Sequence, residues 1–153
     1  MSRLKELRAQ INVELLKMEN PDKMVNAIAH LYGVSLAATM IAKKRGENEE
    51  LASMAGMLHD IYAYTAGTYN DHAHKGADQA REILEKLAVT TAEENDIICS
   101  AIYHHDDKHV VDGPMDEVLK DADVIHHTLN DTSKAVKEKE QVRYAALCEE
   151  FGM

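Results

Sequence analysis

The sequence has few of the residues that interrupt helices or build aromatic cores. Tryptophan is absent, phenylalanine occurs once, and two prolines and seven glycines are spread over 153 residues. Because proline and glycine are the strongest helix breakers, their scarcity favours long, uninterrupted helices. A chain of this length can bury one sizeable core, which we expect aliphatic residues and methionine to fill.

Positive charge is also in short supply. The 17 Lys and Arg residues are outnumbered by 27 Asp and Glu, which gives a formal net charge of −10. This balance argues against nucleic-acid polymers and anionic membranes as partners, since both require a basic surface. The two cysteines, Cys99 and Cys148, form no Cys-x-x-Cys pair and indicate reduced thiols. No signal peptide or transmembrane run is apparent, so we expect a cytoplasmic protein.

The hydrophobic spacing is helical along nearly the whole chain, and no segment alternates like a strand. The expected helices cover about 4–18, 21–45, 48–61, 77–87, 92–105, 114–129 and 133–150. Gly46 supplies a stop for the second helix, and Thr91 with Glu94 fits a capping box for the fifth. The sequence therefore predicts one compact all-α domain over residues 1–153, with about six to eight helices. Residues 1–20 would form an N-terminal helix, 21–130 a metal-binding core and 131–153 a C-terminal helix.

Nine histidines are present, and their placement is informative. His30 lies on the apolar stripe of the second helix, His59 and Asp60 end the third, and Asp123 lies within the sixth. Singly, each has an ordinary explanation: a core histidine, a helix-end hydrogen bond, or a capping carboxylate. Together they place charges in a predicted core, where charges must be paired or bound to a metal. One cation would satisfy all four, and mixed imidazole and carboxylate ligands suit Fe(II), Mn(II), Co(II), Ni(II) or Zn(II).

The order His30, His59-Asp60, Asp123 on successive helices resembles the H…HD…D pattern of the HD superfamily of metal-dependent phosphohydrolases. The segments "HLYGVSLAATMIAKKRG", "LASMAGMLHDI" and "VLKDADVI" resemble its ligand helices, and the resemblance spans roughly Met24 to His127. It implies an HD-domain helical bundle that cleaves a small phosphate ester or anhydride, which we expect to be a nucleotide, with a metal-activated hydroxide. The four residues would hold the first metal, with Asp121 as the alternative to Asp123.

Two further elements resemble the two-metal branch of this superfamily, which includes the HD-type dinucleoside tetraphosphatases. "HAHKGADQA" matches an H-x-x-x-G-A element and selects His72, and "SAIYHH" matches A-I-x-x-H and selects His105. These histidines would complete a second metal site bridged by Asp60, and Asp60 and His105 would be the catalytic residues. His74 and His104 are the alternates at these two places.

The sequence also departs from the two-metal pattern. The lysine that follows the His-Asp pair in many of these enzymes is replaced by Ala63, and the Gly-Tyr-Pro element of the cyclic-dinucleotide phosphodiesterases is missing. The remaining cationic candidates for phosphate contact are Lys75, Lys108 and Lys120.

Three other functions therefore stay open beside a phosphohydrolase. The chain would be a regulatory or sensor HD domain that binds metal without catalysis, a di-iron oxygenase on the same fold, or a structural interaction module that binds no metal.

Overall fold

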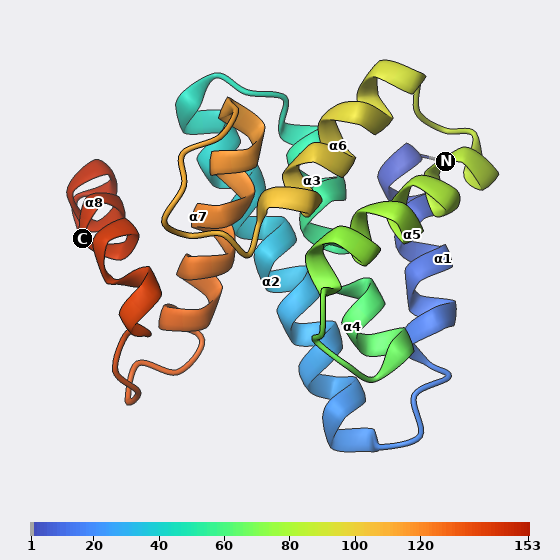
Figure 1. Ribbon diagram of the computed structural model, residues 1–153, viewed down its shortest axis with the longest axis horizontal. Coiled ribbons are helices and arrows are strands. Elements are labelled where there is room, and N and C mark those ends of the chain that lie inside the picture. The colour runs from blue at the N-terminus through green and yellow to red at the C-terminus, as the bar shows by residue number, and fades with distance from the viewer. Residues whose placement is uncertain (1) are drawn as a thin grey trace.

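The computed structural model describes residues 2–153, and within these residues the chain is helical with no strand (Figure 1). The elements are α1 (Arg3–Leu15), α2 (Pro21–Arg45), α3 (Glu49–Leu58), α4 (Ile61–Ala66), α5 (His72–Leu87), α6 (Ala92–His104), α7 (Pro114–Leu129), the 3₁₀ helix η1 (Glu138–Glu140) and α8 (Gln141–Phe151). The prediction of an all-α bundle with six to eight helices is confirmed.

The helix ends that we predicted from capping residues agree with the structure. Helix α2 begins with Pro21 in its first turn and ends before Gly46, whose backbone is left-handed at φ 75°. Thr91 and Glu94 form the reciprocal capping box that begins α6. These signals are local hydrogen bonds and backbone preferences, so they act independently of the tertiary fold.

Four boundaries differ from the sequence prediction. Helix α1 ends at Leu15 instead of near 18, and α5 begins at His72 instead of near 77. The third helix ends at Leu58 instead of continuing to Ile61, because Asp60 leaves helical geometry (φ −111°, ψ 8°) and starts the separate short helix α4. The prediction that a last helix begins near Ser133 is wrong. The Asp131 carboxylate accepts hydrogen bonds from the Ser133 backbone and hydroxyl, a local turn that competes with helix formation. Residues 130–137 are irregular, and the last helix begins at 141.

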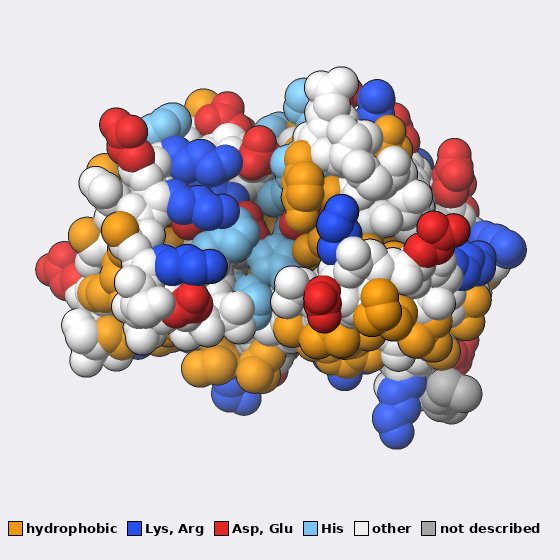
Figure 2. Space-filling view, turned by 90° about the horizontal axis from the view of Figure 1, so that it is seen from below, with side chains coloured by type: hydrophobic (Ala, Val, Ile, Leu, Met, Phe, Trp, Pro, Cys, Tyr) orange, Lys and Arg blue, Asp and Glu red, His pale blue; other side chains and the backbone are white. Residues whose placement is uncertain are grey.

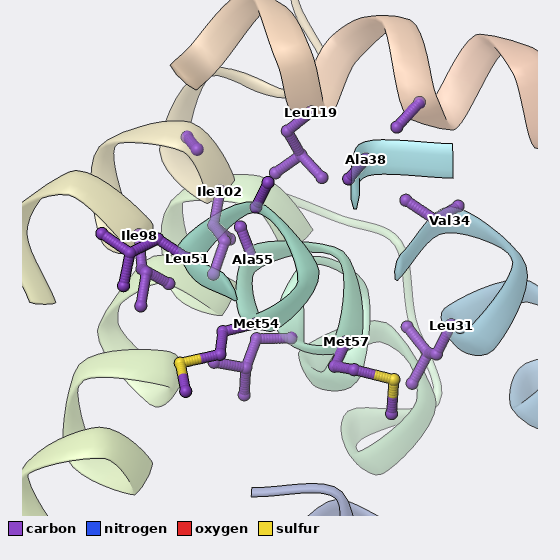
Figure 3. Packing of buried hydrophobic residues seen from close by; sticks show 14 of the residues in the cluster. Leu31, Val34, Ala38, Leu51, Met54, Ala55, Met57, Ile98, Ile102 and Leu119 are labelled. Atoms are coloured by element: carbon purple, nitrogen blue, oxygen red, sulfur yellow. The ribbon is translucent and has the colours of Figure 1, made fainter. Parts of the chain in front are cut away.

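Helix α3 occupies the centre of the core, and residues 51–58 are all buried. Figure 3 shows it surrounded by apolar side chains of α2, α6 and α7. A Cβ added to Gly56 would lie 2.6 Å from the Ser35 Cα, so only glycine permits the observed closeness of α2 and α3. The Ser35 hydroxyl donates to the Ser53 carbonyl across the same contact, at 2.9 Å. Small residues thus bring the histidine-bearing parts of α2 and α3 together.

Helix α2 is long and apolar enough to cross a membrane when judged by length and composition alone, a test that core helices also pass. Here it packs against α3 and α7 and buries a face that includes His30. Helix α8 lies at the edge of the molecule beside α7 and buries only Leu147 (Figure 1).

Candidate metal centre

Side chains from α2, α7 and the α3–α4 junction converge at one wall of a cavity of about 900 Å³. The His30 Nε2 atom lies 3.0 Å from the His59 Nε2 atom. It also lies 3.3 Å from Asp60 Oδ2 and 3.3 Å from Asp123 Oδ1. The break after α3 lets the consecutive residues His59 and Asp60 face the same point, whereas side chains of neighbouring residues within a helix diverge by about 100°.

The two histidines expected at a second site face the other oxygen of Asp60. The Nε2 atoms of His72 and His105 lie 3.5 Å and 3.3 Å from Asp60 Oδ1. These three residues, and separately His30, His59 and Asp60, are groups whose ligand atoms lie within 4.8 Å of one another. The Asp60 carboxylate therefore stands between two pairs of histidine nitrogens.

Backbone carbonyls fix the orientation of three of these rings. The Nδ1 atoms of His59, His72 and His105 lie 2.8, 2.9 and 2.7 Å from the carbonyl oxygen three residues earlier in the chain. The Tyr69 and Ile102 carbonyls also accept the backbone N–H of the same histidine, at 3.2 and 3.3 Å, so the ring and the backbone of His72 and of His105 are held by one oxygen. Because Nδ1 of each ring donates to a carbonyl, Nε2 is the ring nitrogen that faces Asp60.

His30 is oriented by another histidine instead of a carbonyl. Its Nδ1 lies 2.8 Å from the Nδ1 of His126. Burial, together with the charges of His30 and His127, lowers the pKa of His126 to about 4. His126 is therefore neutral and accepts the His30 N–H, which leaves the Nε2 of His30 facing the carboxylates. Gly33 makes room for this contact, because a side chain there would overlap the His126 ring.

The electrostatics of the cluster call for positive charge. Burial raises the pKa of Asp60 and of Asp123, but the charge of His59 on Asp60, and of Lys108 on Asp123, together with histidine hydrogen bonds, lowers both pKa values well below the usual range. Burial lowers the pKa of His59, but the two carboxylates outweigh it and raise that pKa to about 10. Burial lowers the pKa of His105. Both carboxylates are thus ionised, and His59 holds a proton when nothing else supplies charge.

Two aspartate oxygens that face the histidines have no hydrogen-bond partner. Asp60 Oδ1 and Asp123 Oδ1 are buried atoms that accept no hydrogen bond. An unpaired buried carboxylate oxygen is costly, and a bound cation removes that cost. The donor set fits a divalent transition metal, since histidine nitrogens with free lone pairs and ionised carboxylates surround the same points. The residues present can therefore hold such an ion.

A fifth histidine, His127, joins the cluster and was not among the residues selected from the sequence. Its Nε2 lies 3.3 Å from Asp123 Oδ1, and its Nδ1 lies 2.7 Å from Oε1 of the fully buried Glu140. His127 follows Asp123 by four residues on α7, and that helical spacing could have indicated a shared face. Its pairing with Glu140 crosses the irregular segment after α7 and has no signal in the spacing.

The alternates from the sequence lie outside the cluster. Asp121 faces away, with Oδ2 2.8 Å from Arg45 Nη2 and Oδ1 3.1 Å from Arg143 Nη1. The side chain of His74 is 53% exposed, and His104 donates from Nδ1 to a backbone carbonyl one turn earlier in α6. None of the three lines the cavity.

The cationic candidates are likewise elsewhere. Lys75, Lys108 and Lys120 do not line the cavity. Lys108 is buried behind the cluster, where its Nζ donates to Asp123 Oδ2 at 2.7 Å. The lysines that do line the cavity, which the sequence did not single out, are Lys23, Lys134, Lys137 and Lys139.

Comparison with known proteins agrees with this geometry. The HD domain family matches residues 27–128. A protein of Bacillus subtilis (strain 168) with the name "Putative phosphohydrolase YueE" is 29% identical over 141 residues, covering 76% of this chain and 80% of the relative. No solved structure matches the chain significantly. HD domains bind divalent metal ions, and the match covers all the residues of the cluster except Glu140. The chain therefore belongs to the HD domain family.

Proposed function

We propose that the protein is a metal-dependent phosphohydrolase whose first divalent cation is held by His30, His59, Asp60 and Asp123. The observation that carries this proposal is the pair of buried carboxylate oxygens without hydrogen-bond partners, each within 3.5 Å of a histidine Nε2. Because the opposite ring nitrogens are already hydrogen-bonded, these histidines are pre-oriented to donate lone pairs.

We further propose that His72 and His105 hold a second cation, with Asp60 as the bridging ligand. Asp60 has one oxygen toward each pair of histidines, as a bridge requires. Divalent cations in such pairs lie about 3.5–4 Å apart in two-metal enzymes. His127, supported by Glu140, is oriented toward Asp123 and would complete the ligand shell on the side of His30.

A divalent cation at this place supplies Lewis acidity and makes water a usable nucleophile near neutral pH. The protein residues have distinct tasks around it. Asp60 and Asp123 provide the negative charge that binds the cation, and Lys108 fixes one oxygen of Asp123. His105, whose pKa is lowered by burial, presents a neutral Nε2 that accepts a proton when it is not a ligand.

The substrate that we propose is a small phosphate ester or anhydride, in particular a nucleotide. The cavity of about 900 Å³ is near the upper end of the range of about 300–1,000 Å³ that small-molecule sites occupy. Tyr64 and Tyr69 line it, and Tyr69 is 59% exposed and therefore accessible to a planar base. We propose a cytoplasmic location because Cys99 and Cys148 are free thiols. We also propose that residues 1–153 act as one domain, since Glu140 from the C-terminal segment supports His127.

Metal content and hydrolysis, measured together, test the function. Purified wild-type protein is loaded with Mn(II), Fe(II) or Zn(II), and release of p-nitrophenol from p-nitrophenyl phosphate and bis(p-nitrophenyl) phosphate is followed. We expect bound metal and metal-dependent turnover in the wild type and loss of both in His59→Ala. His74→Ala is the matched control, because it removes a histidine that lies outside the cavity.

Other results would identify the alternatives. Bound metal without turnover of any phosphate ester would indicate a sensor domain, and iron-dependent oxygen consumption would indicate an oxygenase. Unchanged metal content in His59→Ala would contradict the proposed site itself.

A further inference from the structure

Lysines gather around the cavity of a strongly acidic protein. Four of the 17 Lys and Arg residues line it: Lys23, Lys134, Lys137 and Lys139. Figure 2 shows Lys and Arg side chains along one side of the hollow in which the histidines are exposed. With a net charge of −10, the molecule as a whole repels anions. A local group of cations at the cavity is therefore the feature that can attract an anionic substrate.

Lys23 shares a helix face with His30. It precedes His30 by seven residues, which is two turns of α2, and Asn26 and His30 line the same cavity. The rise of α2 over seven residues is about 10 Å. The Lys23 side chain therefore joins α2 about two turns from that of His30. It is placed to bind a group that lies further along the cavity.

The other three lysines come from the segment that follows α7. This segment begins just after His127 and returns to the cluster through Glu140, so both of its ends are held at the metal centre. Lys139 donates to Asp106 at 2.9 Å, next to His105, which holds the segment across the cavity. The irregular stretch of residues 130–137 therefore presents its lysines to the cavity.

Two of the four ammonium groups are available for a ligand. Lys139 is paired with Asp106, and Lys134 lies 3.6 Å from Asp131. Among residues 2–153, Lys23 and Lys137 form no ion pair within 4.0 Å, although both line the cavity. Lys23 comes from α2 and Lys137 from the segment after α7.

We infer that the substrate carries at least two phosphate groups: a scissile one at the histidine and aspartate cluster, and a second one bound by Lys23 and Lys137. This inference rests on the proposed hydrolase function and narrows its substrate to an organic bisphosphate or polyphosphate. The cavity is large enough for such a molecule, and the seven-residue spacing of Lys23 and His30 places the second phosphate along α2 from the scissile one.

Comparison of substrates with one and several phosphates tests the inference. The ratio kcat/KM is measured for adenosine 5′-monophosphate, adenosine 3′,5′-bisphosphate and adenosine 5′-triphosphate with the Mn(II)-loaded protein. The variant is Lys23→Gln with Lys137→Gln. The control is Lys5→Gln with Lys86→Gln, which makes the same change in net charge at two exposed lysines outside the cavity. We expect the wild type to favour a bisphosphate or triphosphate over the monophosphate at least tenfold.

In the Lys23, Lys137 variant this preference should fall about tenfold. The kcat/KM for the monophosphate should fall about twofold or less, because only the long-range attraction of the substrate is weakened. The control variant should keep the wild-type preference. Equal use of all three substrates by the wild type, or an undiminished preference in the Lys23, Lys137 variant, would overturn the inference.

Binding of inorganic tripolyphosphate to the metal-free protein, measured by calorimetry, separates the two proposals because it needs no chemistry. One outcome is tenfold weaker tripolyphosphate binding by the Lys23, Lys137 variant, with no hydrolysis of any substrate by the Mn(II)-loaded wild type or variants. That outcome would support the lysine site and refute the proposed hydrolase function. Hydrolysis of the monophosphate, with equal tripolyphosphate binding by variant and wild type, would refute the lysine site alone.

Discussion

Replacement of Asp123 by Asn, compared with the same replacement at Asp121, tests how α7 is used. Both residues are buried on one helix, two positions apart. Asp123 faces the histidine cluster and binds Lys108, whose side chain is fully buried. Asp121 binds Arg45 and Arg143, which also contact other carboxylates. Because the substitution is isosteric, the two variants differ in which charge they remove and hardly in packing.

The expected magnitudes follow from these partners. Removal of one partner of a buried ion pair costs about 3–5 kcal/mol. Asp123→Asn should reach only the lower end, because His59 can release its proton as the cluster loses negative charge. A loss of about 3 kcal/mol lowers the Tm by roughly 6–12 °C for a chain of this length. Asp121→Asn leaves each arginine with another carboxylate, so its cost is about 1 kcal/mol.

The assay is thermal unfolding of the metal-free proteins, repeated with Mn(II) at about 100 times its Kd for the wild type. At that concentration a ligand stabilises the native state by about 2.7 kcal/mol, which raises the Tm by roughly 5–10 °C. The wild type and Asp121→Asn should show this gain, and Asp123→Asn should not. The reasoning would be refuted if Asp123→Asn gained as much Tm from Mn(II) as the wild type, or if Asp121→Asn lost the gain.

Three further outcomes are expected. Titration of Mn(II) into metal-free protein should give two binding events in the wild type and one in the double variant His72→Ala, His105→Ala; one event in both proteins would mean a single-metal site. Glu140→Gln should weaken metal binding or turnover about 10–100-fold, because a buried carboxylate no longer orients His127; calorimetry and kinetics on the folded variant would measure this, and unchanged values would contradict it. The metal-free protein should become less stable as the pH rises from about 6.5 to 10. The pKa of His59 is about 6.5 in the unfolded chain and is raised to about 10 in the folded protein, so protonated His59 stabilises the fold fully below pH 6.5 and this stabilisation is lost as the pH rises through about 10. Denaturant unfolding at several pH values checks the sign, and Mn(II) should reverse the trend, since it binds the deprotonated imidazole.

The fold class and the helix limits at Pro21, Gly46 and Thr91 could be predicted from the sequence because they depend on neighbours within one or two turns. The same holds for the candidates His30, His59, Asp60 and Asp123, which stand out because charged residues interrupt apolar helical stripes. Hydrophobic periodicity and capping are local properties, and residues a few positions apart carry them completely.

The tertiary structure decided what depends on distant residues. It turned Asp123 to the cluster beside His30, and Asp121 to Arg45 at the end of α2 and Arg143 of α8. It brought Glu140 to His127 across a segment whose length and irregular path no spacing rule specifies. It also carried Lys137 to the cavity, although in the sequence this residue reads as an ordinary surface lysine. Such pairings arise when separate elements pack together. The free energy that selects them comes from contacts throughout the core, so no single segment of the sequence determines it.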